Sequence, residues 1–253
     1  MKIIICADAA DAAAKVAASV IAAIAAKPNL TLGLATGATF EPVYAALSAA
    51  CRGGEVSFAG VASFNLDEYV GLPATHPQSY RSVMRRLLFD QIDIDPLRAR
   101  LPNGETDDPD GEALRYEEAI AAAGGVDLQL LGLGVNGHIG FNEPSSSLGS
   151  RTRTKDLAPP TIAANQRHSR PGESVPRRSI TMGVATILEA RDIILLATGA
   201  AKAAALRAAV EGPVSAFCPA SALQFHPRTT VMCDEEAASG FALMDYYRGI
   251  DHE

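Results

Sequence analysis

The sequence predicts an α/β fold in which a doubly wound, mainly parallel sheet carries helices on both faces, an arrangement of the Rossmann-like kind. Two observations predict it. Short apolar runs of strand length alternate with helix-like patterns, and the runs are apolar at successive positions instead of alternating with polar residues. Both patterns are typical of parallel strands buried on both faces. In such sheets ligands bind at the carboxyl ends of the strands.

The expected elements follow one another along the chain. Each strand run is rich in Ile, Leu, Val or Phe, and the first helix places Val16, Val20 and Ile24 on one apolar face. The expected strands cover residues 3–6, 30–35, 56–65, 126–133, 193–198 and 229–233, and the expected helices cover 12–26, 42–50, 79–89, 112–123 and 200–210.

We expect one domain spanning residues 1–253. No internal repeat, low-complexity tract or long linker is evident. The polar stretch 145–176 is the least regular part of the chain, and it is more typical of a lid or flap over an active site than of a domain boundary.

The composition excludes several classes of partner. A net charge of −7 argues against nucleic-acid and anionic-membrane binding, which need a surplus of Lys and Arg. Lys15 and Ser19 interrupt the Ala-rich stretch near the N-terminus, which we therefore interpret as an amphipathic core helix and not a membrane span. The four cysteines are scattered, which is typical of buried thiols in a reducing compartment and not of structural zinc or a disulfide framework. The first apolar run is too short for a signal peptide, so we expect a cytoplasmic protein.

The first candidate binding segment is the glycine turn after the second expected strand. Thr36, Gly37, Ala38 and Thr39 stand between that strand and a helix, where several N–H groups and the helix dipole suit a phosphate. The turn lacks the G-K-[ST] of a nucleotide-binding P-loop. An ordinary glycine turn is the alternative.

A second candidate is the acidic pair Asp67 and Glu68 at the end of the third expected strand. Neighbouring strand residues point to opposite sides, so one carboxylate can face a ligand and act as a general base. A solvated turn is the alternative.

The third candidate is the glycine-rich segment 131–144, which carries His138 and Glu143. Its glycines satisfy the G-x-G-x-x-G string of dinucleotide-binding proteins, but Gly140 and Pro144 interrupt the helix that this fingerprint requires. We interpret the segment as a catalytic loop, because an imidazole titrates near neutrality and a carboxylate beside it can orient it.

Two cations complete the candidate site. Lys202 lies at the expected strand-to-helix turn of the second half, and Arg167 lies in the irregular segment. Together with the glycine turn they can supply the local positive field for a phosphate that the acidic chain lacks as a whole.

These segments together resemble the glucosamine-6-phosphate deaminase family. The resemblance is carried by LATGAT, FNLDEYVGL and GLGVNGHIGFNEPSSSLGSRTR, with HPQSY, ITMGVATIL, ATGAAKAAALRAAVEG and PASALQFHP in the same order, roughly from Leu32 to Glu235. It implies an enzyme of amino-sugar catabolism that converts glucosamine 6-phosphate and water into fructose 6-phosphate and ammonia, with no cofactor and no metal.

The resemblance also implies a role for each motif residue. His138, held by Glu143, opens the sugar ring, and Asp67 moves a proton from C2 to C1. Arg167, Lys202 and the turn from Thr36 to Thr39 hold the 6-phosphate. Some family members carry an Asp where this chain has Asn136, which we therefore expect to support the histidine without exchanging a proton. Ala38 stands where Gly or Ser is commoner.

Regulation and assembly are less determined by the sequence. In regulated members N-acetylglucosamine 6-phosphate binds a stretch that Ser146, Ser147, Arg153 and Lys155 match here. A homo-oligomer is compatible with the sequence, which does not fix the assembly.

Two rival functions use the same scaffold. A 6-phosphogluconolactonase needs no base at C2, so the D-E-Y motif and the spacing of His138 and Glu143 favour the deaminase. A non-catalytic sugar-phosphate sensor would tolerate loss of Asp67 and His138, and this chain keeps both.

Overall fold

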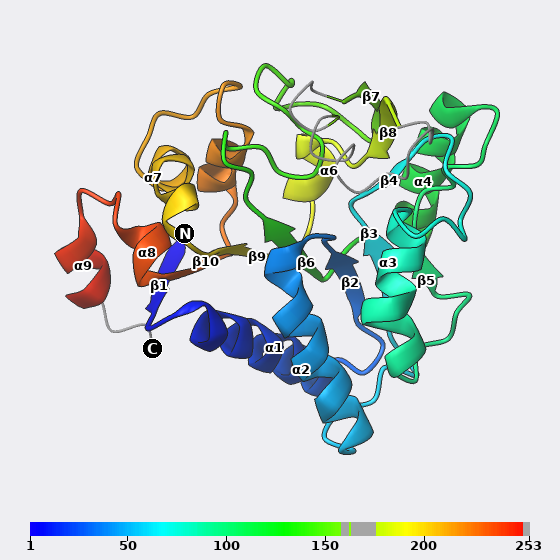
Figure 1. The fold of residues 1–253 in the computed structure, drawn as a ribbon, viewed down its shortest axis with the longest axis horizontal. Helices are drawn as coiled ribbons and strands as arrows, with labels where there is room; N and C mark the ends of the chain where they lie inside the picture. Colours follow the sequence, from blue (N-terminus) through cyan, green and yellow to red (C-terminus); the bar gives the residue numbers. More distant parts are fainter. Residues whose placement is uncertain (158–161, 163–175, 250–253) are drawn as a thin grey trace.

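The fold is a seven-stranded parallel sheet that carries helices and a second, smaller sheet (Figure 1). The computed structural model describes residues 1–157, 162 and 176–249. In spatial order the strands of the main sheet are β1 (Lys2–Cys6), β10 (Thr229–Asp234), β9 (Asp192–Ala197), β6 (Leu128–Gly132), β2 (Thr31–Leu34), β3 (Ala62–Asn65) and β5 (Ala99–Arg100). Every neighbouring pair is parallel, which confirms the predicted fold class.

Helices lie on both sides of this sheet. Figure 1 shows α1 (Ala9–Ala26) and α2 (Glu41–Arg52) below the sheet and α6 (Val184–Leu188) and α7 (Ala203–Val210) above it. The remaining helices are α3 (Tyr80–Leu87), α4 (Pro109–Ala122), α8 (Glu235–Ala238) and α9 (Met244–Gly249), with 3₁₀ turns η1 (Ala38–Phe40), η2 (Phe89–Gln91), η3 (Ala200–Lys202) and η4 (Pro219–Phe225).

Within the described part of the chain, α1 is the one helix long and apolar enough to cross a membrane by length and composition. Its residues Val16, Val20 and Ile24 are buried, and it contacts β1, β9, β10 and α2. Asp8 caps its first turn, and Lys15 pairs with Asp11 on its outer face. These contacts are those of a core helix.

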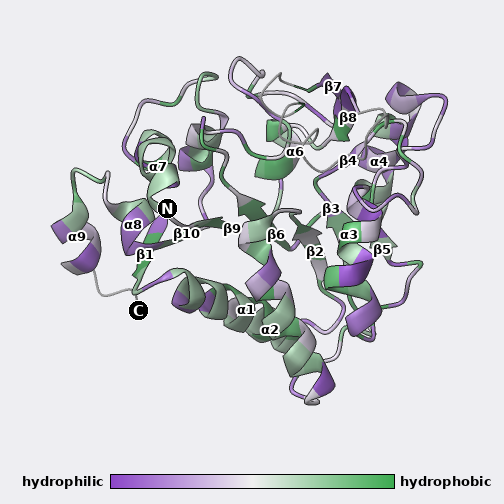
Figure 2. Cartoon of the chain, in the orientation of Figure 1, coloured by the Kyte–Doolittle hydropathy of each residue, from purple (hydrophilic) through white to green (hydrophobic). Residues whose placement is uncertain are grey.

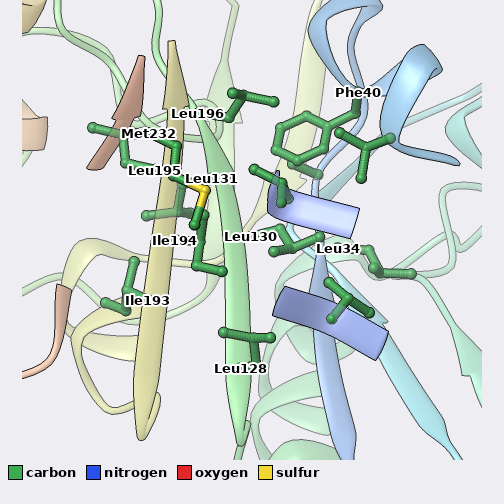
Figure 3. Close-up of a cluster of buried hydrophobic side chains, with 14 of the residues drawn as sticks. Leu34, Phe40, Leu128, Leu130, Leu131, Ile193, Ile194, Leu195, Leu196 and Met232 are labelled. Atoms are coloured by element: carbon green, nitrogen blue, oxygen red, sulfur yellow. The ribbon is translucent and has the colours of Figure 1, made fainter. Parts of the chain in front are cut away.

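The core lies between the sheet and its helices. Leu128, Leu130 and Leu131 of β6 pack beside the apolar run Ile193–Leu196 of β9, with Phe40 and Leu34 close by (Figure 3). Figure 2 shows hydrophilic stretches on α3, α9 and β7, at the outside of the fold. Strands that are apolar at successive positions are therefore buried on both faces, as the sequence predicted.

The second sheet was not predicted. It is antiparallel, in the order β4 (Asp67–Tyr69), β8 (Arg178–Thr181) and β7 (Arg153–Asp156). The third expected strand, 56–65, is wrong in its first half, because only Ala62–Asn65 is a strand. After Leu66 the chain leaves the main sheet and pairs with β8, and this change of sheet places Asp67 at the edge of the main sheet's carboxyl end.

Candidate active site

The strand order creates a crevice between the loops that follow β2 and β6. After β2 the chain passes through α2 to β3, which lies beside β2 on the side away from β6. After β6 the chain returns to the main sheet at β9, which lies beside β6 on the side away from β2. Because the two loops diverge from neighbouring parallel strands, they leave a gap at the carboxyl end of the sheet. A cavity of about 420 Å³ lies there, and it is lined by residues of both loops together with Asp67, His138 and Lys202. The structure thus brings three of the predicted chemical segments together.

A larger depression of about 790 Å³ lies elsewhere, over α7 and residues 240–243. Its lining is mostly apolar, and its two charged residues, Arg207 and Glu211, pair with each other at 3.4 Å. The smaller crevice holds the candidate catalytic groups and is therefore the candidate active site.

The two acids of the D-E-Y motif have different environments. The Glu68 carboxylate accepts hydrogen bonds from the backbone N–H groups of Tyr80 at 2.8 Å and Arg81 at 2.9 Å, and so it fixes the start of α3. Asp67 is only 6% exposed and lines the crevice, and no described residue donates a hydrogen bond to its carboxylate. Glu68 therefore holds the start of α3, and Asp67 is the acid that faces the crevice.

Burial, and secondarily the charge of Glu68, raises the pKa of Asp67 to about 8. An ionised carboxylate in a nearly dry crevice loses its hydration and gains no hydrogen bond in return. A carboxylate with a pKa near neutrality is a far stronger base than an exposed one, which suits removal of a proton from carbon.

The catalytic loop passes close to Asp67 at Gly140. This glycine has φ of 54°, and a Cβ on it would lie 3.4 Å from Oδ2 of Asp67 and 3.0 Å from Oγ1 of Thr181. A side chain there would fill the space beside the carboxylate. Gly140 therefore keeps the Asp67 carboxylate open to the crevice.

His138, Glu143 and Asn136 form one polar group on this loop. Nδ1 of His138 lies 3.3 Å from Oε1 of Glu143, in contact but off the axis of a good hydrogen bond. The other oxygen of Glu143 accepts a hydrogen bond from Nδ2 of Asn136 at 2.7 Å. Oδ1 of Asn136 in turn accepts a hydrogen bond from the backbone N–H of His138 at 3.3 Å. Asn136 therefore bridges the Glu143 carboxylate and the backbone of His138.

Two glycines shape the loop around this group. A Cβ at Gly134 would lie 2.4 Å from the ring of His138, so the imidazole packs directly on the backbone there. Gly137 has φ of 86°, in the left-handed region that favours glycine, and its carbonyl accepts the Ala220 N–H at 2.9 Å. The glycine-rich string therefore serves loop shape and ring packing, and no nucleotide-binding helix follows it in the described residues.

The turn after β2 presents backbone donors to the crevice. Thr36, Gly37, Ala38 and Thr39 all line the cavity, and η1 leads directly into α2. No described residue accepts a hydrogen bond from the N–H groups of Gly37, Ala38 or Thr39. Free N–H groups at the start of a helix bind anions.

Lys202 supplies a positive charge to the same crevice. It stands at the end of η3, it is half-buried, and burial lowers its pKa. It has no carboxylate partner among the described residues. A partly desolvated cation without a counter-ion favours an anionic ligand. Arg167, the other predicted cation, lies outside the described residues.

The sequence did not predict the aromatic residues that line one side of the crevice. Tyr80 and Phe141 line the crevice with their rings stacked at 6.0 Å, and the hydroxyl groups of Tyr80 and Tyr69 lie 3.2 Å apart. Burial raises the pKa of Tyr80 well above its usual range, so its phenol stays neutral. Tyr80 is the last residue of the HPQSY motif, and this motif was the sequence signal that could have indicated its place in the crevice.

The residues matched to an activator site lie apart from this crevice. Ser146 is buried and its hydroxyl makes no hydrogen bond to any described residue, whereas Ser147 is exposed. Arg153 and Lys155 lie on β7, where the Arg153 guanidinium donates to Oδ1 of Asn142 at 2.9 Å. None of the four lines the crevice.

Comparisons with known proteins show the family of the chain. A family described as glucosamine-6-phosphate isomerases and 6-phosphogluconolactonases matches residues 7–232. The glucosamine-6-phosphate deaminase of Shewanella loihica is 53% identical over 253 residues, covering 100% of this chain and 94% of the relative. That of Hahella chejuensis is 54% identical over 254 residues, covering 100% of this chain and 97% of the relative.

Solved structures give the same picture. A monomeric glucosamine-6-phosphate deaminase superposes with a TM-score of 0.92 at 42% identity, covering 95% of this chain and 100% of its own. The 6-phosphogluconolactonase of Trypanosoma cruzi superposes with a TM-score of 0.76 at 22% identity, covering 95% and 97%. The lactonase likeness shows the shared fold alone.

Proposed function

The chain belongs to the family of glucosamine-6-phosphate isomerases and 6-phosphogluconolactonases, and from that premise we propose that its crevice deaminates glucosamine 6-phosphate to fructose 6-phosphate and ammonia. The observation that carries the proposal is the buried Asp67 carboxylate, which accepts no hydrogen bond from any described residue and lies in the same cavity as His138 and Lys202. A base for a carbon-bound proton, a group for ring opening and a cation for the phosphate are what this reaction needs.

The phosphate is held at the end of the crevice formed by the turn after β2. Free N–H groups of Gly37, Ala38 and Thr39 and the ammonium of Lys202 surround it. Arg167 is proposed as a third contact on the sequence alone. Anchoring this non-reacting group fixes the sugar in the cavity and converts binding energy into correct placement of C1 and C2.

Ring opening is assigned to His138. It takes the proton of the C1 hydroxyl, and the imidazolium that forms gives this proton to the ring oxygen as the bond between C1 and the ring oxygen breaks, which leaves an open-chain aldehyde. Glu143, held by Asn136, stabilises the imidazolium that forms. Because Asn136 cannot take up a proton itself, the proton cycle runs through His138 and Glu143.

The proton transfer from C2 to C1 is assigned to Asp67. Its carboxylate removes the proton from C2 of the aldehyde, the electrons of the C2–H bond form the C1–C2 double bond, and the carbonyl oxygen takes up the proton that the C2 ammonium group releases, which gives an enolamine. The same carboxyl group then returns the proton to C1, which leaves an imine at C2 and a hydroxyl at C1. Water adds to the imine, and loss of ammonia gives the ketone of fructose 6-phosphate.

The lactonase is the rival reaction on this fold. It adds water to an ester carbonyl and needs no base at C2, so the D-E-Y motif and the spacing of His138 and Glu143 favour the deaminase. The two are separated by offering the enzyme glucosamine 6-phosphate and 6-phosphogluconolactone side by side. We expect equal amounts of ammonia and fructose 6-phosphate from the first and no accelerated hydrolysis of the second. The opposite pattern would refute the proposal.

Pathway, location and regulation extend the proposal. We place the enzyme in amino-sugar catabolism in the cytoplasm, with Ser146, Ser147, Arg153 and Lys155 as a site for an activating sugar phosphate. Titration with N-acetylglucosamine 6-phosphate tests the last point, since activation should be lost in Arg153→Ala. The superposed deaminase is described as monomeric, and sedimentation of this chain decides its own assembly.

A further inference from the structure

The chain contains two copies of one turn. The string Leu-Ala-Thr-Gly-Ala stands at residues 34–38 and again at 196–200, a short repeat that the sequence analysis overlooked. The first copy joins β2 to α2 through η1, and the second joins β9 to α7 through η3.

The two turns end in matching backbone conformations, although their glycines differ, with φ of 158° at Gly37 and 85° at Gly199. Phe40 donates its N–H to the Gly37 carbonyl at 2.9 Å, and Lys202 donates its N–H to the Gly199 carbonyl at 3.0 Å. Phe40 has φ −92° and ψ −11°, and Lys202 has φ −93° and ψ −12°. Lys202 therefore occupies in the second turn the place that Phe40 occupies in the first.

The turns differ in what their N–H groups bind. In the first turn the N–H groups of Gly37 and Ala38 have no acceptor among the described residues and face the crevice. In the second turn the Gly199 N–H donates to both oxygens of Asp234, at 3.0 and 2.9 Å. The next N–H, of Ala200, donates to Glu236 at 3.3 Å. Carboxylates of the chain itself thus occupy in the second turn the position that the ligand's phosphate takes in the first.

We propose that Asp234 is a positioning residue for the substrate phosphate, because it holds the second turn in the shape that directs Lys202 into the crevice. This inference rests on the proposed function, in which Lys202 contacts the phosphate. Asp234 itself does not contact the ligand.

Three observations suit Asp234 to this part. It is 5% exposed at the end of β10, and its Oδ1 also accepts the Ala237 N–H at 2.8 Å, so the carboxylate is anchored on both sides. Helix α8, which it caps, contacts η3 and α7. Lys202 has a flexible side chain and no carboxylate partner among the described residues, so the position of its backbone decides whether its ammonium reaches the crevice.

The sign of the effect separates positioning from simple charge. Removing a negative charge near a phosphate site should strengthen phosphate binding by Coulomb's law. Releasing the turn should weaken it, because the ammonium then samples positions outside the crevice. The two causes predict opposite changes for the same substitution.

The test uses the whole enzyme with inorganic phosphate and fructose 6-phosphate as titrated ligands. Asp234→Ser keeps a hydroxyl that can cap α8 but is too short to hold the Gly199 N–H. Asp234→Asn keeps Oδ1 but turns a donor toward that N–H, and it serves if the serine variant does not fold. Glu235→Gln is the matched control, because it removes one charge from the neighbouring exposed residue, which pairs with Arg248.

We expect Asp234→Ser and Asp234→Asn to weaken binding of both ligands about three- to tenfold and to raise KM with little change in kcat, as a misplaced contact does. Glu235→Gln should leave binding unchanged or slightly tighter. In a Lys202→Ala background the Asp234 substitutions should have no further effect. Unchanged or tighter binding in the Asp234 variants, or an equal loss with and without Lys202, would overturn the inference. Wild-type binding in Lys202→Ala alone would instead overturn the phosphate site itself.

Discussion

Replacing Asp67 with asparagine should make this protein more stable at alkaline pH while leaving it unchanged in acid. The native carboxyl has a pKa raised from 3.8 to about 8, with burial the main cause. In the unfolded chain the same group ionises near pH 4. Between about pH 4 and pH 8 the unfolded state therefore releases a proton that the native state retains, and the free energy of unfolding falls as the pH rises. Above about pH 8 the carboxyl group is ionised in both states, and the native state carries the full free-energy cost of burying a carboxylate.

The size of this cost follows from the same shift. At about 1.4 kcal/mol per pKa unit, the carboxylate destabilises the native state by at most about 5–6 kcal/mol above pH 8. Water entering the open crevice reduces the penalty, so we expect about 2–4 kcal/mol. The neutral amide of Asp67→Asn has the shape of the carboxyl and never ionises, so the variant should escape this cost.

The assay is urea unfolding followed by circular dichroism at several pH values from 4 to 9. The difference between Asp67→Asn and the wild type should be within about 1 kcal/mol at pH 4 and should grow to its full value by pH 9. Asp107→Asn is the matched control, because Asp107 is exposed and its replacement removes a carboxylate that the crevice does not bury. Parallel stability curves for Asp67→Asn and the wild type would show that the carboxylate is not destabilised by the crevice.

Three further predictions concern catalysis and binding. His138→Gln should lower the rate with the cyclic substrate by about 10²–10⁴-fold in steady-state kinetics, and an equal defect with a substrate that cannot cyclise would contradict its role in ring opening. Lys202→Ala and Arg167→Ala should each weaken fructose 6-phosphate binding about ten- to a hundredfold, equivalent to about 1.5–3 kcal/mol, without changing the feeble binding of fructose measured by the same calorimetric titration. Gly134→Ala should displace the His138 ring, since the added Cβ would lie 2.4 Å from it, and so should reduce turnover more than stability; full activity would show that the ring position is not critical.

The sequence predicted six of the seven strands of the main sheet, because these strands are buried and consist of apolar runs. It missed the edge strand β5, whose two residues, Ala99–Arg100, carry no pattern of their own. It missed β7, because Arg153–Asp156 is polar throughout and becomes a strand only by pairing with β8. Strand β4 was missed because it has only three residues, which follow the change from the main sheet to the second sheet and carry no pattern of their own. Long-range pairing decides both cases.

The sequence predicted which residue types form the candidate site better than it predicted the role of each residue. Position alone left Asp67 and Glu68 equivalent, and the start of α3 decides between them by engaging Glu68. The repeated turn could be seen in the sequence, but its structural role depends on Asp234. This residue lies 35 positions beyond Gly199 in the chain, and only the pairing of strands in the sheet brings the two together. Contacts of this kind follow from the fold and not from local pattern.

The central claim is that Asp67 carries a proton from C2 to C1 of glucosamine 6-phosphate. Its most direct test is ammonia and fructose 6-phosphate production by Asp67→Asn, with binding of fructose 6-phosphate measured on the same preparation. We predict that the variant binds within about threefold of the wild type but retains less than about 1% of its turnover, the loss usual for a missing general base. Turnover well above that level with intact binding would contradict the claim and would place the base elsewhere in the crevice.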